Sequence, residues 1–358
     1  MLTTIAKPFG MLLMWLYELV ANYGIAVILF AIVVKIILLP FQMKSKRGTM
    51  KSSRLQPQMA ELQKKHGANK QKYNEEMQKL YKEEGVNPAS GCIWGIIPLP
   101  ILLALYQAIR FPITIMMGVG ADLLAEGGAI VTKLADLGFV QTVTDAYVQI
   151  QQTQFISLPE NFNVFVSLAD KLRQIDYNFL GMDLGAVPSF KFWQYNWSGG
   201  ASEWGPQLLL FLVPIVAGGL SLVQSLIMQK IQPTQVPTGD GAAAAGGSMK
   251  MMTYLMPLMS VYFAFIMPAA LGIYWAASSV LQIIQEVVLT KHYTKILDAE
   301  DEIKNRDRKA RDTEIERKRL ETEQLKAENK TETNKSTSKK KLEAAEEAEE
   351  AKEAETVD

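Results

Sequence analysis

Lys35 is the residue of this sequence whose type and position most clearly indicate chemistry. It interrupts an apolar run from Ile25 to Phe41 that would span most of a bilayer as a helix, at roughly 1.5 Å per residue. A cation inside such a segment costs on the order of 2.5–3.5 kcal/mol on insertion scales, and therefore usually faces protein or water rather than lipid. The sequence therefore predicts a polar site within a membrane. In a medium of low dielectric, the fixed positive charge of Lys35 would attract acidic groups to that site.

Other apolar segments carry polar side chains on one helical face, which extends this prediction. In segment 269–290 the helical repeat brings together Tyr274, Ser278, Gln282 and Gln285. Segments 207–229 and 250–267 show similar clusters, namely Ser221, Gln224 and Ser225 in the first and Thr253 and Ser260 in the second. A lone Ser or Thr in such a helix usually bonds to its own backbone or to a neighbour. Three polar faces together with an embedded cation favour one shared hydrophilic cavity.

Two simpler interpretations of Lys35 stay open from the residues alone. Lys35 lies five residues before Pro40, so its ammonium group has the reach to snorkel to the inner headgroups. Alternatively it forms a structural ion pair with Glu286, which lies four residues before the end of the last apolar segment and at a similar depth. Glu286 is therefore the candidate charge partner.

The apolar segments that must position these residues number five, and they predict an all-α membrane protein. We expect spans at about 22–41, 91–117, 207–229, 250–267 and 269–290. Residues 41–90 carry 11 Lys and Arg, whereas 118–205 carry four. The positive-inside rule then places 41–90 and the C-terminus in the cytoplasm and the N-terminus outside.

The segments around these spans have distinct compositions. Residues 1–21 predict an interfacial helix, with a signal segment as the alternative, because Glu18 interrupts the apolar stretch. Residues 42–90 predict a basic helical hairpin, which serves either only to fix topology or as a docking platform. Loop 118–206 has no visible catalytic constellation, 231–249 is a Gly/Ala-rich linker, and 291–358 is a charged tail whose acidic end we expect to be disordered.

Several classes of function find no support in the sequence. A single cysteine, Cys92, excludes an intramolecular disulfide, and the only histidines, His66 and His292, are far apart. No nucleotide-binding loop or nucleophile elbow is present, so we expect neither an enzyme nor a bound cofactor or metal.

An ordered set of motifs across 22–290 resembles the YidC/Oxa/Alb family of membrane protein insertases, in the form that lacks a large extracytoplasmic domain and is typical of Gram-positive bacteria. The motifs are Ile32-Val-Val-Lys-Ile-Ile-Leu-Leu-Pro40, Leu55-Gln-Pro57, Glu76 to Pro88, Gly91-Cys92, Pro100 to Ile109, Leu180-Gly-Met-Asp-Leu184, Met256-Pro257, and Pro268 followed by Leu271-Gly-Ile-Tyr-Trp275. Each motif is weak alone, but their order and spacing are specific to the family.

The resemblance implies a five-helix insertase core enclosing a hydrophilic groove that is open to the cytoplasm and to lipid. It implies insertion of nascent membrane proteins into the bacterial plasma membrane without nucleotide hydrolysis, alone or with the Sec translocon. Ribosomes and membrane lipids are further expected partners, and DNA is not. Two departures from the family are Lys35, where arginine is usual, and Trp94 with Pro98 near the second span. The groove residues expected are Lys35, Ser221, Gln224, Tyr274, Trp275, Ser278 and Gln282.

Two other classes of protein share many of these features. A membrane assembly chaperone would bind substrates without inserting them. A secondary transporter or channel would also carry intramembrane polar groups, but the sequence lacks the inverted repeat that many transporters have.

Overall fold

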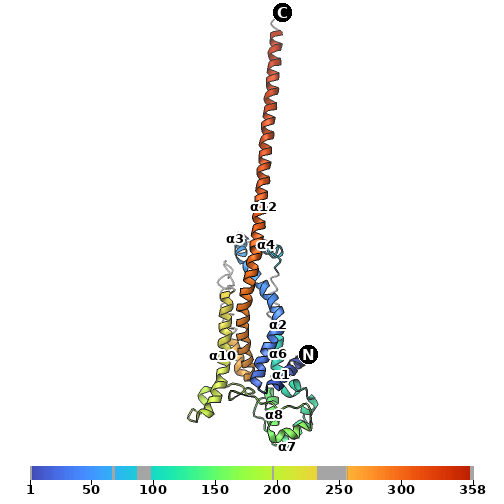
Figure 1. Ribbon diagram of the computed structural model, residues 1–358, viewed down its shortest axis with the longest axis vertical. Helices are drawn as coiled ribbons and strands as arrows, with labels where there is room; N and C mark the ends of the chain where they lie inside the picture. Colours follow the sequence, from blue (N-terminus) through green and yellow to red (C-terminus); the bar gives the residue numbers. More distant parts are fainter. Residues whose placement is uncertain are drawn as a thin grey trace. The chain divides into compact units, whose positions relative to one another are not determined.

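The computed structural model describes residues 2–66, 69–86, 98–195, 197–231, 255 and 257–354, and over these residues the chain is almost entirely helical (Figure 1). It divides into two compact units, residues 1–293 and 294–358. The longer helices are α1 (Leu2–Val20), α2 (Tyr23–Arg54), α3 (Gln56–His66), α4 (Lys70–Glu83), α6 (Pro98–Arg110), α10 (Ala201–Ile231) and α12 (Ala269–Ala354).

Shorter elements fill the segment between α6 and α10. The helices are η1 (Pro112–Met116), η2 (Ala121–Leu124), α7 (Ala129–Asp136), η3 (Asp145–Tyr147), α8 (Val148–Ile156), α9 (Pro159–Val166) and η4 (Phe192–Gln194). The only described strands, β1 (Asn178–Phe179) and β2 (Met182–Asp183), form one antiparallel hairpin. Its two-residue turn has positive φ at Leu180 and Gly181, as tight hairpins require.

Three described helices are long and apolar enough to cross a membrane: α2, α10 and the N-terminal part of α12. A shorter apolar helix, Pro257–Ile266, lies before α12. The predicted second span corresponds to α6 and η1, and its first residues, including Trp94, lie outside the described residues, as does the linker after Ile231. The five-span count and the domain limits therefore stay predictions, whereas the all-α membrane fold is confirmed.

The helix that carries Lys35 is longer than the sequence indicated. We expected the first span to end near residue 41 and the basic hairpin to begin at 42, but α2 is continuous through Pro40 to Arg54. Pro40 removes one backbone hydrogen bond to the carbonyl of Ile36, and the remaining helical bonds and the packing of α2 carry the helix past it. Asn22 begins α2, because its side chain accepts a hydrogen bond from the Ile25 amide at 3.0 Å.

Helix α1 is part of the bundle core. It packs against α6, α2 and η1, and it buries Ala6, Leu13 and Leu16. Its outward face also carries large apolar side chains, such as Met11 and Trp15, which are 62% and 59% exposed. An outward apolar face suits contact with lipid hydrocarbon more than a water-facing surface.

The start of α12 is fixed by the segment that precedes α10. The amides of Ala269 and Ala270 donate to the carbonyls of Ala186 and Leu184, at 2.9 and 3.0 Å. These bonds satisfy two of the donors that a helix N-terminus leaves free. The same segment contacts α2, because Phe179 lies over Gly24, where a Cβ atom would come within 2.3 Å of the ring. Helices α2 and α12, which carry most of the polar residues described below, are thus each held at one end by this segment.

Helices α3 and α4 lie against each other as the predicted hairpin requires. The Tyr81 hydroxyl of α4 donates to the Met59 sulfur of α3 at 3.4 Å, which joins the two helices. Asn69 caps α4 by accepting from the Lys72 amide at 3.1 Å, and Gly85, at φ 62°, ends it.

In the second unit, 294–358, the described residues are helical as far as Ala354. This includes part of the acidic end that we expected to be disordered, and residues 355–358 lie outside the described residues. The pair Glu314–Lys318, at 2.8 Å, shows the i, i+4 spacing of opposite charges that supports exposed helices.

Candidate functional site

Lys35 lies on α2 and donates a hydrogen bond to the Gln282 side chain on α12. The two residues are 247 positions apart in the sequence, and both side chains are half-buried. Both were predicted groove residues, and the structure brings them into direct contact. An amide oxygen is a neutral acceptor, so Lys35 keeps an uncompensated positive charge in this pair.

Glu286 has a different partner from the one we expected. It forms an ion pair with Lys46, and the two side chains are only 6% and 5% exposed. The expectation that Glu286 pairs with Lys35 is therefore corrected. Lys46 follows Lys35 by 11 residues, which is about three helical turns, so it shares the same face of α2 because the helix continues through Pro40.

A third helix joins this region through Ser221 on α10. Its hydroxyl lies 3.3 Å from that of Ser279 on α12 and donates to the Ala217 carbonyl at 2.9 Å. The three helices are drawn in blue (α2), yellow (α10) and orange (α12) in Figure 1. We call the six residues that make these cross-helix contacts the polar cluster: Lys35, Lys46, Ser221, Ser279, Gln282 and Glu286.

The other predicted groove residues lie on the same helices, with different exposure. Tyr274 is buried, with its ring 6.2 Å from that of Phe30, so it packs in the core of the bundle. Gln224, Trp275 and Ser278 are half-buried.

Lys46, Ser279 and Gln42 were not predicted as site residues from the sequence. Lys46 was counted among the basic residues of the cytoplasmic loop. Continuing the helical repeat of Lys35 through Pro40 would have found both Gln42, seven residues on, and Lys46. Gln42 Oε1 is buried and accepts no hydrogen bond within the described structure, so it adds a further polar atom to this face.

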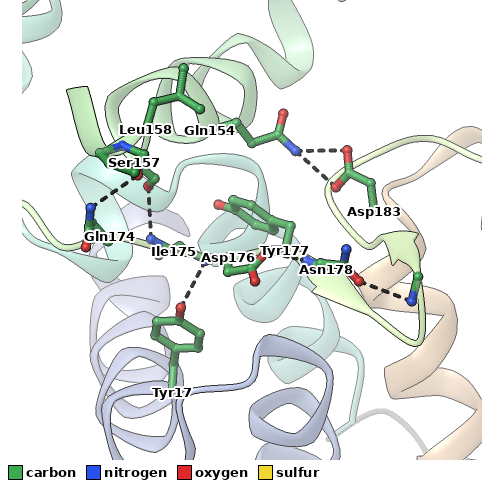
Figure 2. Close-up of a pocket in the computed structure, with 12 residues that line it drawn as sticks. Tyr17, Gln154, Ser157, Leu158, Gln174, Ile175, Asp176, Tyr177, Asn178 and Asp183 are labelled. Carbon is green, nitrogen blue, oxygen red and sulfur yellow. Dashed lines mark hydrogen bonds between the residues drawn. The ribbon is translucent and has the colours of Figure 1, made fainter. Parts of the chain in front are cut away.

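Apart from the polar cluster, a concave region lies beside the C-terminal end of α1, as Figure 2 shows. This cavity of about 710 Å³ is lined mainly by polar groups that bond to one another. Gln154 donates to both carboxylate oxygens of Asp183, at 3.0 and 2.9 Å, and the Asp176 amide donates to the Tyr17 hydroxyl at 2.9 Å. Burial raises the pKa of Tyr177, which lies in the same wall, well above its usual value of 10.

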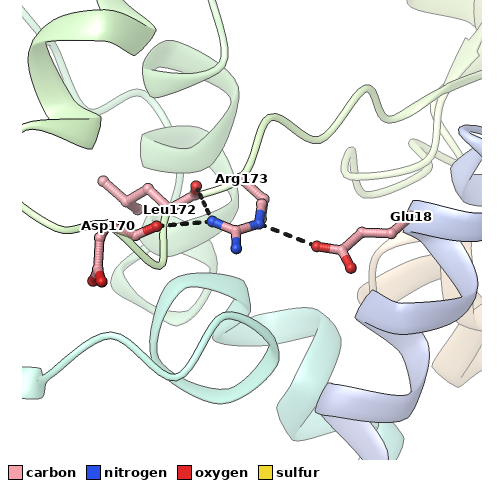
Figure 3. Close-up of polar contacts among 4 residues, drawn as sticks. All are labelled: Glu18, Asp170, Leu172 and Arg173. Carbon is pink, nitrogen blue, oxygen red and sulfur yellow. Dashed lines mark hydrogen bonds and ion pairs between the residues drawn. The ribbon is translucent and has the colours of Figure 1, made fainter.

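An ion pair between Glu18 and Arg173 joins α1 to the loop between α9 and β1 (Figure 3). Arg173 donates to Glu18 at 3.1 Å and to the carbonyls of Asp170 and Leu172 at 2.8 and 3.0 Å. These contacts are structural, because each joins residues of the loop to one another or to α1. Among the described residues, no group of three or more His, Cys, Asp or Glu could hold a metal ion.

Long apolar helices joined by buried polar contacts define the class: this is an all-α integral membrane protein. The chain belongs to the family described as 60Kd inner membrane protein, whose family model matches residues 15–296. This confirms the resemblance seen in the motifs, and it makes the chain a protein of a bacterial membrane.

The relatives that match over most of this chain are named membrane protein insertase YidC. The one from Treponema denticola is 27% identical over 281 residues, covering 78% of this chain and 36% of the relative. The one from Treponema pallidum is 26% identical, covering 81% and 36%. A third, from Maridesulfovibrio salexigens, is 44% identical over 105 residues, or 29% of this chain and 20% of the relative. The chain thus spans about a third or less of the length of these relatives.

Proposed function

We propose that this protein inserts nascent membrane proteins into the bacterial membrane through a hydrophilic path along the polar cluster. The observation that carries the proposal is the contact of Lys35 with the neutral Gln282, within helices whose composition suits a membrane. A charge in that position is costly, and such groups usually mark a path or binding site for polar substrates. The insertase names of the relatives support the same function.

The mechanism follows from charge and hydrophobicity. Lys35 attracts an acidic residue in the short segment that must cross the membrane, and the polar side chains shorten the stretch of hydrocarbon to be crossed. The apolar segment of the substrate then moves past α10 and α12 into lipid. Removing its surface from water yields roughly 0.025 kcal/mol per Å², so the step needs no nucleotide.

The topology and partners belong to the same proposal. The hairpin α3–α4 and the residues just before it are rich in Lys and Arg, which favours a cytoplasmic location for the hairpin, with the N-terminus outside and the C-terminus inside. In the cytoplasm the hairpin would meet the emerging polypeptide near the lipid headgroups. The protein would act alone or beside the Sec translocon. Docking of a ribosome on the charged tail is a further part of the proposal.

Reconstitution into liposomes tests this function. A short single-span substrate is made by translation in the presence of the vesicles, and its translocated tail is assayed by protection from protease. We expect protection by the parent protein and its loss with Lys35→Ala. Ile37→Ala is the matched control, because Ile37 is two residues away on the same helix and 57% exposed.

Each contrary result points to another class of protein. A substrate that binds but stays sensitive to protease would contradict autonomous insertion and favour an assembly chaperone, and the assay would be repeated with the Sec translocon. Solute flux through the vesicles without insertion would favour a transporter or channel.

A further inference from the structure

The two lysines of the polar cluster converge on one short stretch of α12. Lys35 and Lys46 are 11 residues apart on α2, a rise of about 16 Å, whereas their acceptors Gln282 and Glu286 are four residues apart on α12, a rise of about 6 Å. The flexible lysine side chains take up the difference. Residues four apart on a helix have neighbouring side chains, so the two acceptors lie on adjacent turns of one face of α12.

The two acceptors differ in charge, and this difference decides which lysine has an uncompensated positive charge. Glu286 supplies the single negative charge among these four side chains and neutralises Lys46, while Gln282 is neutral and leaves Lys35 charged. A charge-assisted hydrogen bond to a carboxylate is roughly twice as strong as one between neutral groups. Lys35 would therefore exchange Gln282 for Glu286 if that carboxylate were free, because only one helical turn separates the two acceptors.

We propose that Lys46 is a positioning residue that holds Glu286 away from Lys35 and so keeps the charge of Lys35 available to acidic substrate segments. This inference rests on the proposed function. It predicts that removing one cation will disable another: without Lys46, Glu286 captures Lys35 and competes with the substrate. A purely structural ion pair would instead affect all substrates alike.

Two substrates that differ only in the tail test the inference. One tail carries acidic residues and the other is neutral, and the measured quantity is the ratio of their protease-protected fractions. We expect Lys46→Met to lower this ratio about fivefold, toward the value of Lys35→Met. The double variant K46M/E286Q should return the ratio to within about twofold of the parent, since its competing carboxylate is gone. Lys46→Arg, which keeps the pairing charge, should match the parent.

A second measurement reports the exchange without any insertion. A membrane-permeant carbodiimide joins a carboxylate to an adjacent amine as an amide, and mass spectrometry identifies the linked peptides. In the parent we expect Glu286 linked to Lys46, and in Lys46→Met or Lys46→Gln we expect it linked to Lys35. Lys46→Gln keeps a hydrogen-bond donor toward Glu286, and it replaces Lys46→Met if that variant fails to accumulate.

The outcomes separate the inference from the function. An unchanged ratio in Lys46→Met, or no link between Lys35 and Glu286 in either variant, would overturn the inference. A parent protein that inserts neither substrate would overturn the proposed function, while the cross-link would still decide whether Lys46 restrains Glu286.

Discussion

Replacing Glu286 by alanine should destabilise the helical bundle strongly, because it leaves Lys46 charged and without its acceptor. The side chains of Lys46 and Glu286 are 5% and 6% exposed, so little water reaches the pair. Removing one partner of such a buried pair typically costs about 3–5 kcal/mol, since the desolvation cost of the remaining ion is no longer offset. At about 2–4 °C per kcal/mol, we expect the melting temperature to fall by roughly 6–20 °C.

The double variant K46M/E286L separates the cost of an unpaired charge from the net value of the pair. It replaces both ions with apolar side chains of similar size, so neither charge of the pair is left buried. Such replacements are often neutral or stabilising in other proteins. We expect its stability to lie within about 1 kcal/mol of the parent or above it.

Thermal unfolding in detergent at a fixed scan rate, followed by circular dichroism, measures these effects. Glu76→Ala is the control, because Glu76 and Lys79 form an ion pair at 2.8 Å on α4 with side chains 33% and 63% exposed. Exposed pairs contribute little to stability, so this variant should melt like the parent. If Glu286→Ala shifts the melting temperature no more than Glu76→Ala does, the reasoning that the Lys46–Glu286 pair is dry and tightly coupled is refuted.

Two further predictions concern packing and alkaline pH. A Cβ atom on Gly218 of α10 would lie 2.0 Å from the Val261 side chain, so Gly218→Ala should lower the stability by about 1–3 kcal/mol in the same melting assay. A Cβ atom on the neighbouring Gly219 would have no neighbour within 4 Å, so Gly219→Ala should stabilise the helix by about 0.5–1 kcal/mol. Equal effects of the two alanines would contradict this packing of α10. Because burial raises the pKa of Tyr177 above 10 in the folded state, the unfolded state loses that proton first, so stability is full below pH 10 and falls as the pH rises above it. Tyr177→Phe should weaken this fall, measured as the difference in melting temperature between pH 9 and pH 11, and an unchanged difference would contradict the assignment.

Local features of the sequence were enough to predict the membrane class, a cation at Lys35 within an apolar helix, and the family. Hydrophobic length and the embedded cation are properties of one segment, and the motifs are read along the chain. The helical repeat also brought Ser278 and Gln282 to one face, and Gln282 proved to be the acceptor of Lys35. These inferences need only the geometry of a single helix.

The pairing of charges was decided by the tertiary structure. Which acid meets which lysine depends on the register between α2 and α12, which lie some 240 residues apart in the chain, and on the continuation of α2 through Pro40. We predicted that the first span would end near residue 41, and this limit placed Lys46 in the cytoplasmic hairpin, apart from Lys35. Likewise, the contact of Ser221 with Ser279 and the burial of α1 against α6 follow from helix packing, which no single segment determines. The sequence thus specified a cation within an apolar segment, and the packing of the helices determined that Lys35 meets the neutral Gln282 while Glu286 pairs with Lys46.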